Sequence, residues 1–447
     1  MDIFYKTRRV PGIGEILDWL IALILVISPI TQHYIAVFVN AGWTLWVVAA
    51  VLIVLRMMFG RVGSVYLYKN ETIAYLLLLI YYLYHLIDHG FTLGKVFTTV
   101  IILWLYFFIA EGQLNTKMFV RIATAIAVIN VICMILQYIC YYLFRYNLQF
   151  VDLSLLVDQD VRWVTRLSST SADLSLYRPS GIFLEPSHAF LFSFPLILYY
   201  FTNDSPTKEG TRIAWLLMFG VLISTSGMGL VFVLAMLAAY FIMYRKPKYK
   251  RGSLWNLFTP RTLMLFLAAI IVIWFSYQTI DVVRNTINRV ISTDSEGYNA
   301  ISGRTSKGIK LLSQMSEDQI LFGITDSMGD LGKSISGFQG EMYKYGIAGI
   351  VISYAYYVFF LLKSRKKNVK YLALALLVLS FVCAHTHRDF YMLYFGVFLF
   401  DGIRGNGVRY AEELQNNVDK IYSDQRELAA KPAEDPRNTD ADALQAE

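Results

Sequence analysis

Charge is what this sequence has least of. Only 16% of its 447 residues are Asp, Glu, Lys or Arg, whereas 56% are hydrophobic and 15% aromatic. Soluble domains carry about 25% charged residues, so the composition excludes an ordinary soluble enzyme. Cysteine is scarce too, and the three residues present, Cys133, Cys140 and Cys383, lie inside apolar runs. They have the spacing of neither a metal site nor a disulfide framework, so we interpret them as small core residues.

Several sequence signatures are also missing, and each absence removes a class of protein. The alternating pattern of a membrane β-barrel is absent. There is no Walker motif, so ATP is not expected to drive the activity. Basic residues form no stripe interleaved with aromatics, which argues against nucleic-acid binding. Lys6, Arg8 and Arg9 precede an apolar run, but no small-residue cleavage site follows, so we expect a retained first span rather than a signal peptide.

Long apolar runs are what the sequence does contain. A helix needs roughly 17–25 apolar residues to cross a hydrocarbon core about 30 Å thick. Runs of this kind predict an all-α polytopic membrane protein with about twelve transmembrane helices. They cover approximately residues 16–38, 42–59, 71–88, 93–110, 119–143, 188–202, 213–224, 228–244, 260–278, 338–362, 369–384 and 390–403.

The basic residues between these runs predict the orientation. Short clusters such as residues 245–251 and 363–370 fall in alternate connections, which the positive-inside rule assigns to the cytosol. Both termini are then cytosolic, and two long loops, at about 145–187 and 279–336, face outward. Residues 1–404 make up the transmembrane domain, and residues 405–447 form a polar cytosolic tail that we expect to be partly disordered.

Both long outer loops carry arginine, whose planar fork binds phosphate with two hydrogen bonds and keeps its charge when partly buried. Two such loops converging over a membrane pocket would suit a lipid-linked diphosphate. Ordinary surface charge, or binding to anionic lipid headgroups, is the alternative. The best candidates for anion ligands are Arg178 and Arg304, with Arg284, Arg289 and Arg388 as secondary contacts.

The stretch 178–188 contains a cation, two prolines, a glycine, a carboxylate and an imidazole, at the point where the chain is expected to enter a span. Glu185 could accept a proton from a sugar hydroxyl, or it could be the structural partner of Arg178. A second carboxylate, Glu341, lies just inside a later span, where an ion pair with Lys344 at i, i+3 is the alternative.

Two further stretches combine polar and small residues. His385, His387, Arg388 and Asp389 share one outer turn. Two histidines at i, i+2 without another clear ligand fit zinc poorly, so we expect no metal and favour Arg388 as an anion contact. Residues 224–229, Ser-Thr-Ser-Gly-Met-Gly, join two spans at membrane depth, where irregular backbone must line a cavity or be covered by protein.

Three stretches together resemble the Wzy-type polymerases of O-antigen and capsular polysaccharide, a family related to the O-antigen ligases. The first is the arginine, glycine, phenylalanine and Glu-Pro-Ser run within residues 178–187. The second is Ser302-Gly303-Arg304, followed by residues 320–324. The third is the segment 337–349, where Gly346 and Gly349 match the family's paired glycines.

The resemblance implies a GT-C-like membrane glycosyltransferase on the outer face of the bacterial inner membrane. Such an enzyme joins oligosaccharide repeat units carried on undecaprenyl diphosphate into O-antigen, capsule or exopolysaccharide, without a metal or a soluble nucleotide. Its partners would be the lipid-linked donor and acceptor and the surrounding membrane lipids, and a chain-length regulator is left open. By the same analogy the arginines hold the diphosphate, and Glu185, then Glu341, are the candidates for the general base.

One departure from the family bears on the choice of activity. Related ligases carry a His-Asn pair ahead of the paired glycines, where this chain has Ile335-Ser336. The polymerase is therefore preferred over the ligase. A lipid-linked oligosaccharide flippase is a third hypothesis, because such a protein would also have about twelve spans. A flippase should concentrate its charges in a central cavity, whereas here they lie at the outer ends of spans.

Overall fold

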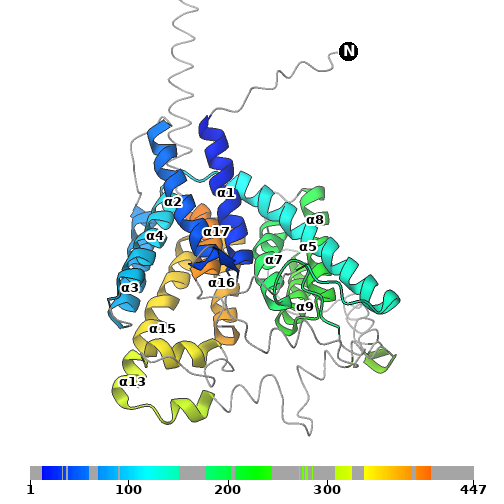
Figure 1. Cartoon of the computed structure of the whole chain (residues 1–447). Helices are drawn as coiled ribbons and strands as arrows, with labels where there is room; N and C mark the ends of the chain where they lie inside the picture. Colours follow the sequence, from blue (N-terminus) through cyan, green and yellow to red (C-terminus); the bar gives the residue numbers. More distant parts are fainter. Residues whose placement is uncertain are drawn as a thin grey trace, which may run out of the picture. The chain divides into compact units, whose positions relative to one another are not determined.

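The computed structural model describes residues 13–32, 34–36, 39–59, 69–88, 91–150, 177–202, 207–243, 271, 274–275, 277–279, 284, 308–324, 337–383 and 389–403. All of them belong to one compact unit, residues 1–403. The predicted tail, 405–447, lies outside the described residues. Within the described ranges the regular secondary structure is helical apart from an antiparallel pair of two-residue strands, β1 (Ile35–Ala36) and β2 (Val39–Asn40) (Figure 1).

Each expected span except the ninth coincides with a helix. The ninth, about 260–278, falls largely outside the described residues. The first helix ends at Thr31 rather than near residue 38, because the strand pair follows it. The helices are α1 (Ile13–Thr31), α2 (Ala41–Phe59), α3 (Lys69–Asp88), α4 (Leu93–Ala110), α5 (Thr116–Phe144), α7 (Pro186–Phe201), α8 (Lys208–Ile223), α9 (Gly227–Met243), the short α13 (Glu317–Phe322), α15 (Gly337–Lys363), α16 (Lys367–Val382) and α17 (Asp389–Ile403).

Six helices in the described part of the chain are long and apolar enough to cross a membrane: α1 to α5 and α15. The chain is therefore a helical membrane protein. The other apolar helices of the described part are shorter, so the number of spans and their orientation stay predictions.

The helix starts follow from local capping chemistry. Thr92, Asn115 and Thr207 each precede a helix, and each side-chain oxygen accepts a hydrogen bond from the backbone N–H three residues later. Such caps satisfy amide groups that have no partner inside the helix. At its other end α5 stops at Arg145, which adopts a left-handed conformation with φ of 56°.

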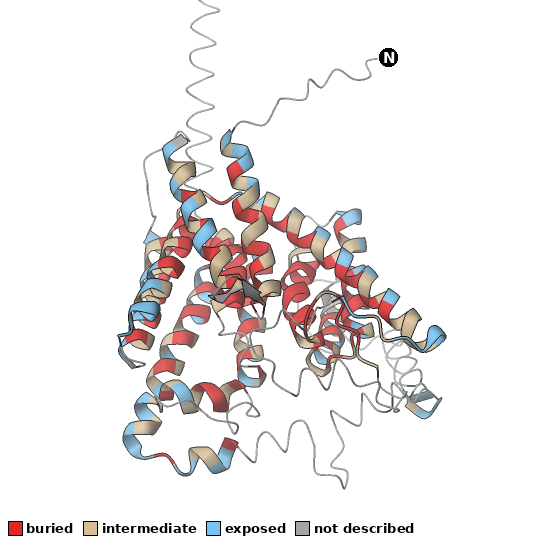
Figure 2. Cartoon of the chain, viewed as in Figure 1, coloured by how far each residue is buried: buried red, intermediate tan, exposed pale blue. Residues whose placement is uncertain are grey.

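The outer helices expose apolar faces. In α2, Val47, Val51 and Val54 are exposed, whereas Trp46 and Ile53 are fully buried. The exposed residues recur at helical spacing, so they form one stripe, and α3 has a similar one (Figure 2). A stripe of this kind would be unfavourable in water but suits contact with lipid tails.

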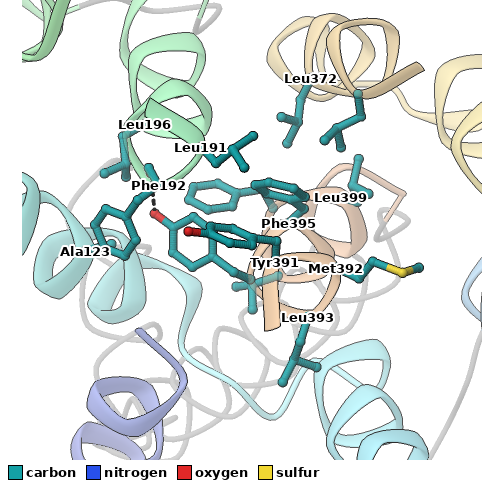
Figure 3. Close-up of a cluster of buried hydrophobic side chains, with 14 of the residues drawn as sticks. Ala123, Leu191, Phe192, Leu196, Leu372, Tyr391, Met392, Leu393, Phe395 and Leu399 are labelled. Atoms are coloured by element: carbon teal, nitrogen blue, oxygen red, sulfur yellow. Dashed lines mark hydrogen bonds between the residues drawn. The ribbon is translucent and has the colours of Figure 1, made fainter. Parts of the chain in front are cut away.

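The centre of the bundle is occupied by α17 and α7. Helix α17 packs against α1, α3, α4, α5, α7, α15 and α16 and is buried along nearly its whole length. Phe192 of α7 stacks on Tyr394 of α17, whose hydroxyl donates to the Phe192 carbonyl at 3.0 Å. Figure 3 shows Phe192 in the same buried cluster as Tyr391 and Phe395 of α17. At 15 residues, α17 is about 22 Å long, shorter than the bilayer core. Protein rather than lipid surrounds it, so its length need not match the membrane.

Helix α15 consists of two segments joined at Gly346. This glycine has φ of 62° and ψ of −170°, a conformation that only glycine adopts readily. The segment that ends α13 packs against this break, and its Ile324 N–H donates to the Tyr343 carbonyl at 2.8 Å. The Tyr84 hydroxyl of α3 donates to the carbonyls of Phe322 and Tyr345, so backbone groups freed by the break find partners inside the protein.

Candidate functional site

The stretch 178–188 folds as a tight turn packed on α5. Gly181 sits in this turn with φ of 64°, in the left-handed region. A Cβ atom at this position would collide with the side chain and carbonyl oxygen of Asn130. The turn continues with the Phe183 N–H donating to the Ser180 carbonyl at 3.2 Å. Only glycine therefore allows the chain to approach α5 this closely.

Two amide side chains of α5, Asn130 and Gln137, hold the turn in place. The Gln137 Oε1 atom accepts from the Gly181 N–H at 2.8 Å, and its Nε2 atom donates to the Leu148 carbonyl at 3.2 Å. The Asn130 Oδ1 atom accepts from the Ile182 N–H at 2.8 Å. Asn130 and Gln137 are seven residues apart, so they lie on the same face of the helix, and both are buried. Two side chains of α5 thus hold the turn by accepting hydrogen bonds from backbone N–H groups of the turn.

The turn leads directly into α7, with Glu185 as the N-cap and Pro186 in the first turn. The Glu185 carbonyl accepts from the N–H groups of His188 and Ala189, and its Oε2 atom accepts from the Ser187 hydroxyl at 2.7 Å. A carboxylate and a helix N-terminus attract each other. The Glu185 carboxylate is thereby fixed at the positive end of α7, half-buried rather than free in solvent.

Tyr177, next to Arg178, forms an aromatic contact at the C-terminal end of α5. Its ring stacks on Tyr141 with centroids 4.0 Å apart, and its hydroxyl donates to Asn147 Oδ1 at 3.3 Å. Burial raises the pKa of Tyr177 to about 12, so the hydroxyl stays protonated at neutral pH. Arg178 is half-buried beside it, which places the guanidinium where partial desolvation strengthens contact with an anion.

The starts of α7 and α17 lie together, as do the starts of α15 and α17 and the end of α3. The Tyr391 hydroxyl donates to the His188 carbonyl at 3.5 Å. The Tyr82 hydroxyl of α3 donates to Asp389 Oδ1 at 3.1 Å. Glu341 near the start of α15 is buried and interacts electrostatically with Tyr81 of α3. The two candidate carboxylates, Glu185 and Glu341, therefore belong to the same end of the bundle.

The ion pair that the sequence suggested for Glu341 and Lys344 is not among those found in the described residues, which are Arg56–Asp18 and Lys366–Asp401. Lys344 is exposed while Glu341 is buried. Burial of the carboxylate is therefore not explained by that pair, and a chemical role for Glu341 stays a prediction.

Arg284 is the other expected anion ligand that the structure describes. Its Nε atom donates to the Tyr277 carbonyl at 3.2 Å, and its Nη2 atom donates to the Gln278 carbonyl at 2.5 Å. These bonds satisfy carbonyl groups of the preceding helical segment, so part of the Arg284 guanidinium group already binds the backbone. Arg284 as an anion ligand therefore stays a prediction.

The remaining predicted site residues, Arg289, Arg304 and Arg388, lie outside the described residues, as do His385 and His387. Where the chain is described, no group of three or more His, Cys, Asp or Glu side chains could hold a metal ion. The serine-rich joint between α8 and α9 is buried: Ser224 and Ser226 are covered, and Thr225 has a positive φ of 51°. The protein therefore covers this joint.

The residues that support the candidate site, above all Asn130, Gln137 and Asp389, were not predicted from the sequence. A signal was available for the first two, because buried amides seven residues apart in an apolar span must find hydrogen-bond partners in the protein. Asp389 was noted only as part of the 385–389 turn. Its hydrogen bond to Tyr82 links positions 307 apart in sequence.

No family, curated protein or solved structure matches the chain.

Replacing Gln137 by leucine is expected to lower the free energy of unfolding by about 1–3 kcal/mol, because the buried Gly181 N–H loses its acceptor. The measurement is the apparent Tm of the purified protein in detergent. Gln314→Leu is the matched control, since Gln314 is exposed. Equal Tm values for the two variants would show that α5 does not hold the turn.

Proposed function

We propose that this protein is a membrane glycosyltransferase that joins oligosaccharide repeat units carried on a lipid diphosphate. Its products would be O-antigen, capsular or exopolysaccharide chains. The proposal places the reaction on the outer face of a bacterial inner membrane, with undecaprenyl diphosphate as the carrier lipid. It includes about twelve spans, cytosolic termini and two outer loops.

The observation that carries the proposal is the turn 178–188. A half-buried arginine and a half-buried glutamate stand at its two ends, and buried side chains of α5 hold its backbone rigidly between them. A rigid site that presents a cation and a carboxylate at a membrane boundary suits a reaction in which a diphosphate leaves and a hydroxyl loses a proton.

In the proposed reaction an acceptor sugar hydroxyl attacks the anomeric carbon of the donor sugar. The new C–O bond forms as the bond from that carbon to the diphosphate oxygen breaks, and the diphosphate leaves with the electron pair. Arg178, together with Arg304, stabilises the charge that develops on the leaving group. Arg284, Arg289 and Arg388 are secondary contacts. The hydroxyl proton passes to a carboxylate, for which Glu185 and Glu341 are the candidates.

Reconstitution tests this proposal. Purified protein in liposomes is supplied with the lipid-linked repeat unit of its own source, and products are separated by length. A ladder of chains differing by one repeat unit is the expected result. Transfer of finished chains to another acceptor would instead indicate a ligase. Movement of unaltered units across the bilayer would indicate a flippase.

A further inference from the structure

A second polar cluster lies inside the bundle, between α3, α4, α15 and α17. Its members are two carboxylates and the tyrosines around them, and we call it the tyrosine–carboxylate cluster. It consists of Glu341, Asp389, Tyr81, Tyr82, Tyr106, Tyr356 and Tyr357. Ionisable side chains buried among membrane helices are costly, and they mark functional sites more often than packing.

Asp389 anchors one side of the cluster. Its Oδ1 atom accepts from the Tyr82 hydroxyl at 3.1 Å, and the Tyr82 and Tyr81 rings meet edge to face with centroids 5.2 Å apart. The Asp389 carboxylate also interacts electrostatically with the hydroxyls of Tyr81 and Tyr106. One hydroxyl of α3 thus donates directly to the carboxylate at the start of α17.

Glu341 anchors the other side. It is only 6% exposed and interacts electrostatically with Tyr81 and Tyr357. The ring of His85 bridges the same region, with centroids 4.2 Å from Tyr81 and 4.0 Å from Tyr345. Both carboxylates therefore interact electrostatically with the same tyrosine, Tyr81, although they come from different helices.

Two buried hydroxyls in the cluster, those of Tyr106 and Tyr356, have no hydrogen-bond partner among the described residues. Tyr356 is 1% exposed, and its hydroxyl makes no hydrogen bond to any described residue. It lies next to Tyr357, with ring centroids 5.4 Å apart, and interacts electrostatically with Tyr106. A buried hydroxyl without a partner costs about 1–3 kcal/mol. A cluster that served only stability would contain a phenylalanine at this position.

The cluster adjoins the turn that holds Glu185. Asp389 is two residues before Tyr391, whose hydroxyl donates to the carbonyl of His188 in the first turn of α7. The first turn of α17 thus connects the carboxylates of the cluster with the start of α7 at Glu185.

We propose that the tyrosine–carboxylate cluster is the proton-accepting centre of the transfer reaction, with Asp389 and Glu341 as the acceptors. The inference rests on the proposed function. As the acceptor oxygen bonds to the anomeric carbon, its O–H proton moves to a carboxylate oxygen, and the tyrosine hydroxyls stabilise the carboxylate charge beforehand. Glu185 then positions the turn rather than accepting the proton.

The test compares Asp389→Asn and Glu341→Gln with Asp401→Asn in the reconstituted system. Asp401 lies at the opposite end of α17 and pairs with Lys366 at 2.6 Å. Loss of a general base lowers a rate by about 10²–10⁴-fold. We expect a loss of this size in chain extension for the single variants at 389 and 341, binding of the lipid-linked donor within about twofold of wild type, and no loss for Asp401→Asn. Added formate should partly restore extension in Asp389→Ala, as expected when an external carboxylate replaces a missing base.

Chain extension by both carboxylate variants at the rate of Asp401→Asn would overturn the inference. Should these variants fail to fold, Tyr82→Phe removes only the hydroxyl bonded to Asp389, and an unchanged rate in that variant would overturn it equally. Failure of the proposed function looks different, because the wild-type protein itself would then produce no ladder.

Discussion

Arg178→Gln is expected to abolish long-chain polysaccharide while the protein still inserts into the membrane at wild-type levels. Glutamine keeps much of the side chain's length and polarity but removes the charge that would face a departing diphosphate. Charge-assisted contacts to phosphate are about twice as strong as neutral ones, and removal of one group that stabilises developing charge costs about 10²–10³-fold in rate. The turn itself is held through backbone atoms by α5, so its fold should survive the change.

The measurement for Arg178→Gln is chain length in cells and ladder formation by the purified protein. Arg145→Gln is the matched control, because Arg145 follows α5 at the same end of the bundle but is exposed. Wild-type chain lengths from Arg178→Gln, made at normal levels, would show that this residue does not hold the leaving group. A loss shared equally with Arg145→Gln would indicate a general effect of surface charge.

Gly346→Ala is expected to destabilise the fold strongly, although it adds only one methyl group. The conformation at Gly346 is essentially restricted to glycine, and its Cβ would meet the Leu321 carbonyl group and the Gly323 nitrogen. These are backbone atoms of the segment docked on the break, so they cannot swing aside. Strain and steric overlap together should cost about 2–5 kcal/mol.

Gly340→Ala is the matched control for this substitution. Gly340 lies in the same helix, and a Cβ there would meet nothing within 4 Å. We expect Gly346→Ala to lower the apparent Tm strongly or to prevent recovery of folded protein, and Gly340→Ala to leave the Tm nearly unchanged or slightly raised. Similar Tm values would mean that α15 does not need its break.

The two substitutions probe different parts of one end of the bundle. The turn 178–188 is fixed to α5, whereas the break in α15 is fixed to α3 through Tyr84. Arg178→Gln should therefore alter activity without altering stability. Gly346→Ala should alter both, because the break orients the segment that carries Glu341.

Hydropathy located the described helices well, because a continuous apolar run near 20 residues long has few alternatives to a helix in a membrane. It could not identify α17 as the buried centre, since a run that faces protein and a run that faces lipid are equally apolar. The exposed stripe of α2 and the enclosed surface of α17 differ only in their neighbours. The end of α1 at Thr31 was misplaced because apolar residues continue into the strand pair.

At the candidate site, the sequence by itself determined which unusual residues lie at the start of an apolar helix: Arg178, Gly181, Glu185 and Pro186. Those residues are adjacent in the chain, so local composition was enough. Only the tertiary structure decided that Gln137 holds Gly181, and that Asp389 meets Tyr82. These partners come from helices distant in sequence, and packing of the helices, rather than any local preference, brings them within hydrogen-bond distance.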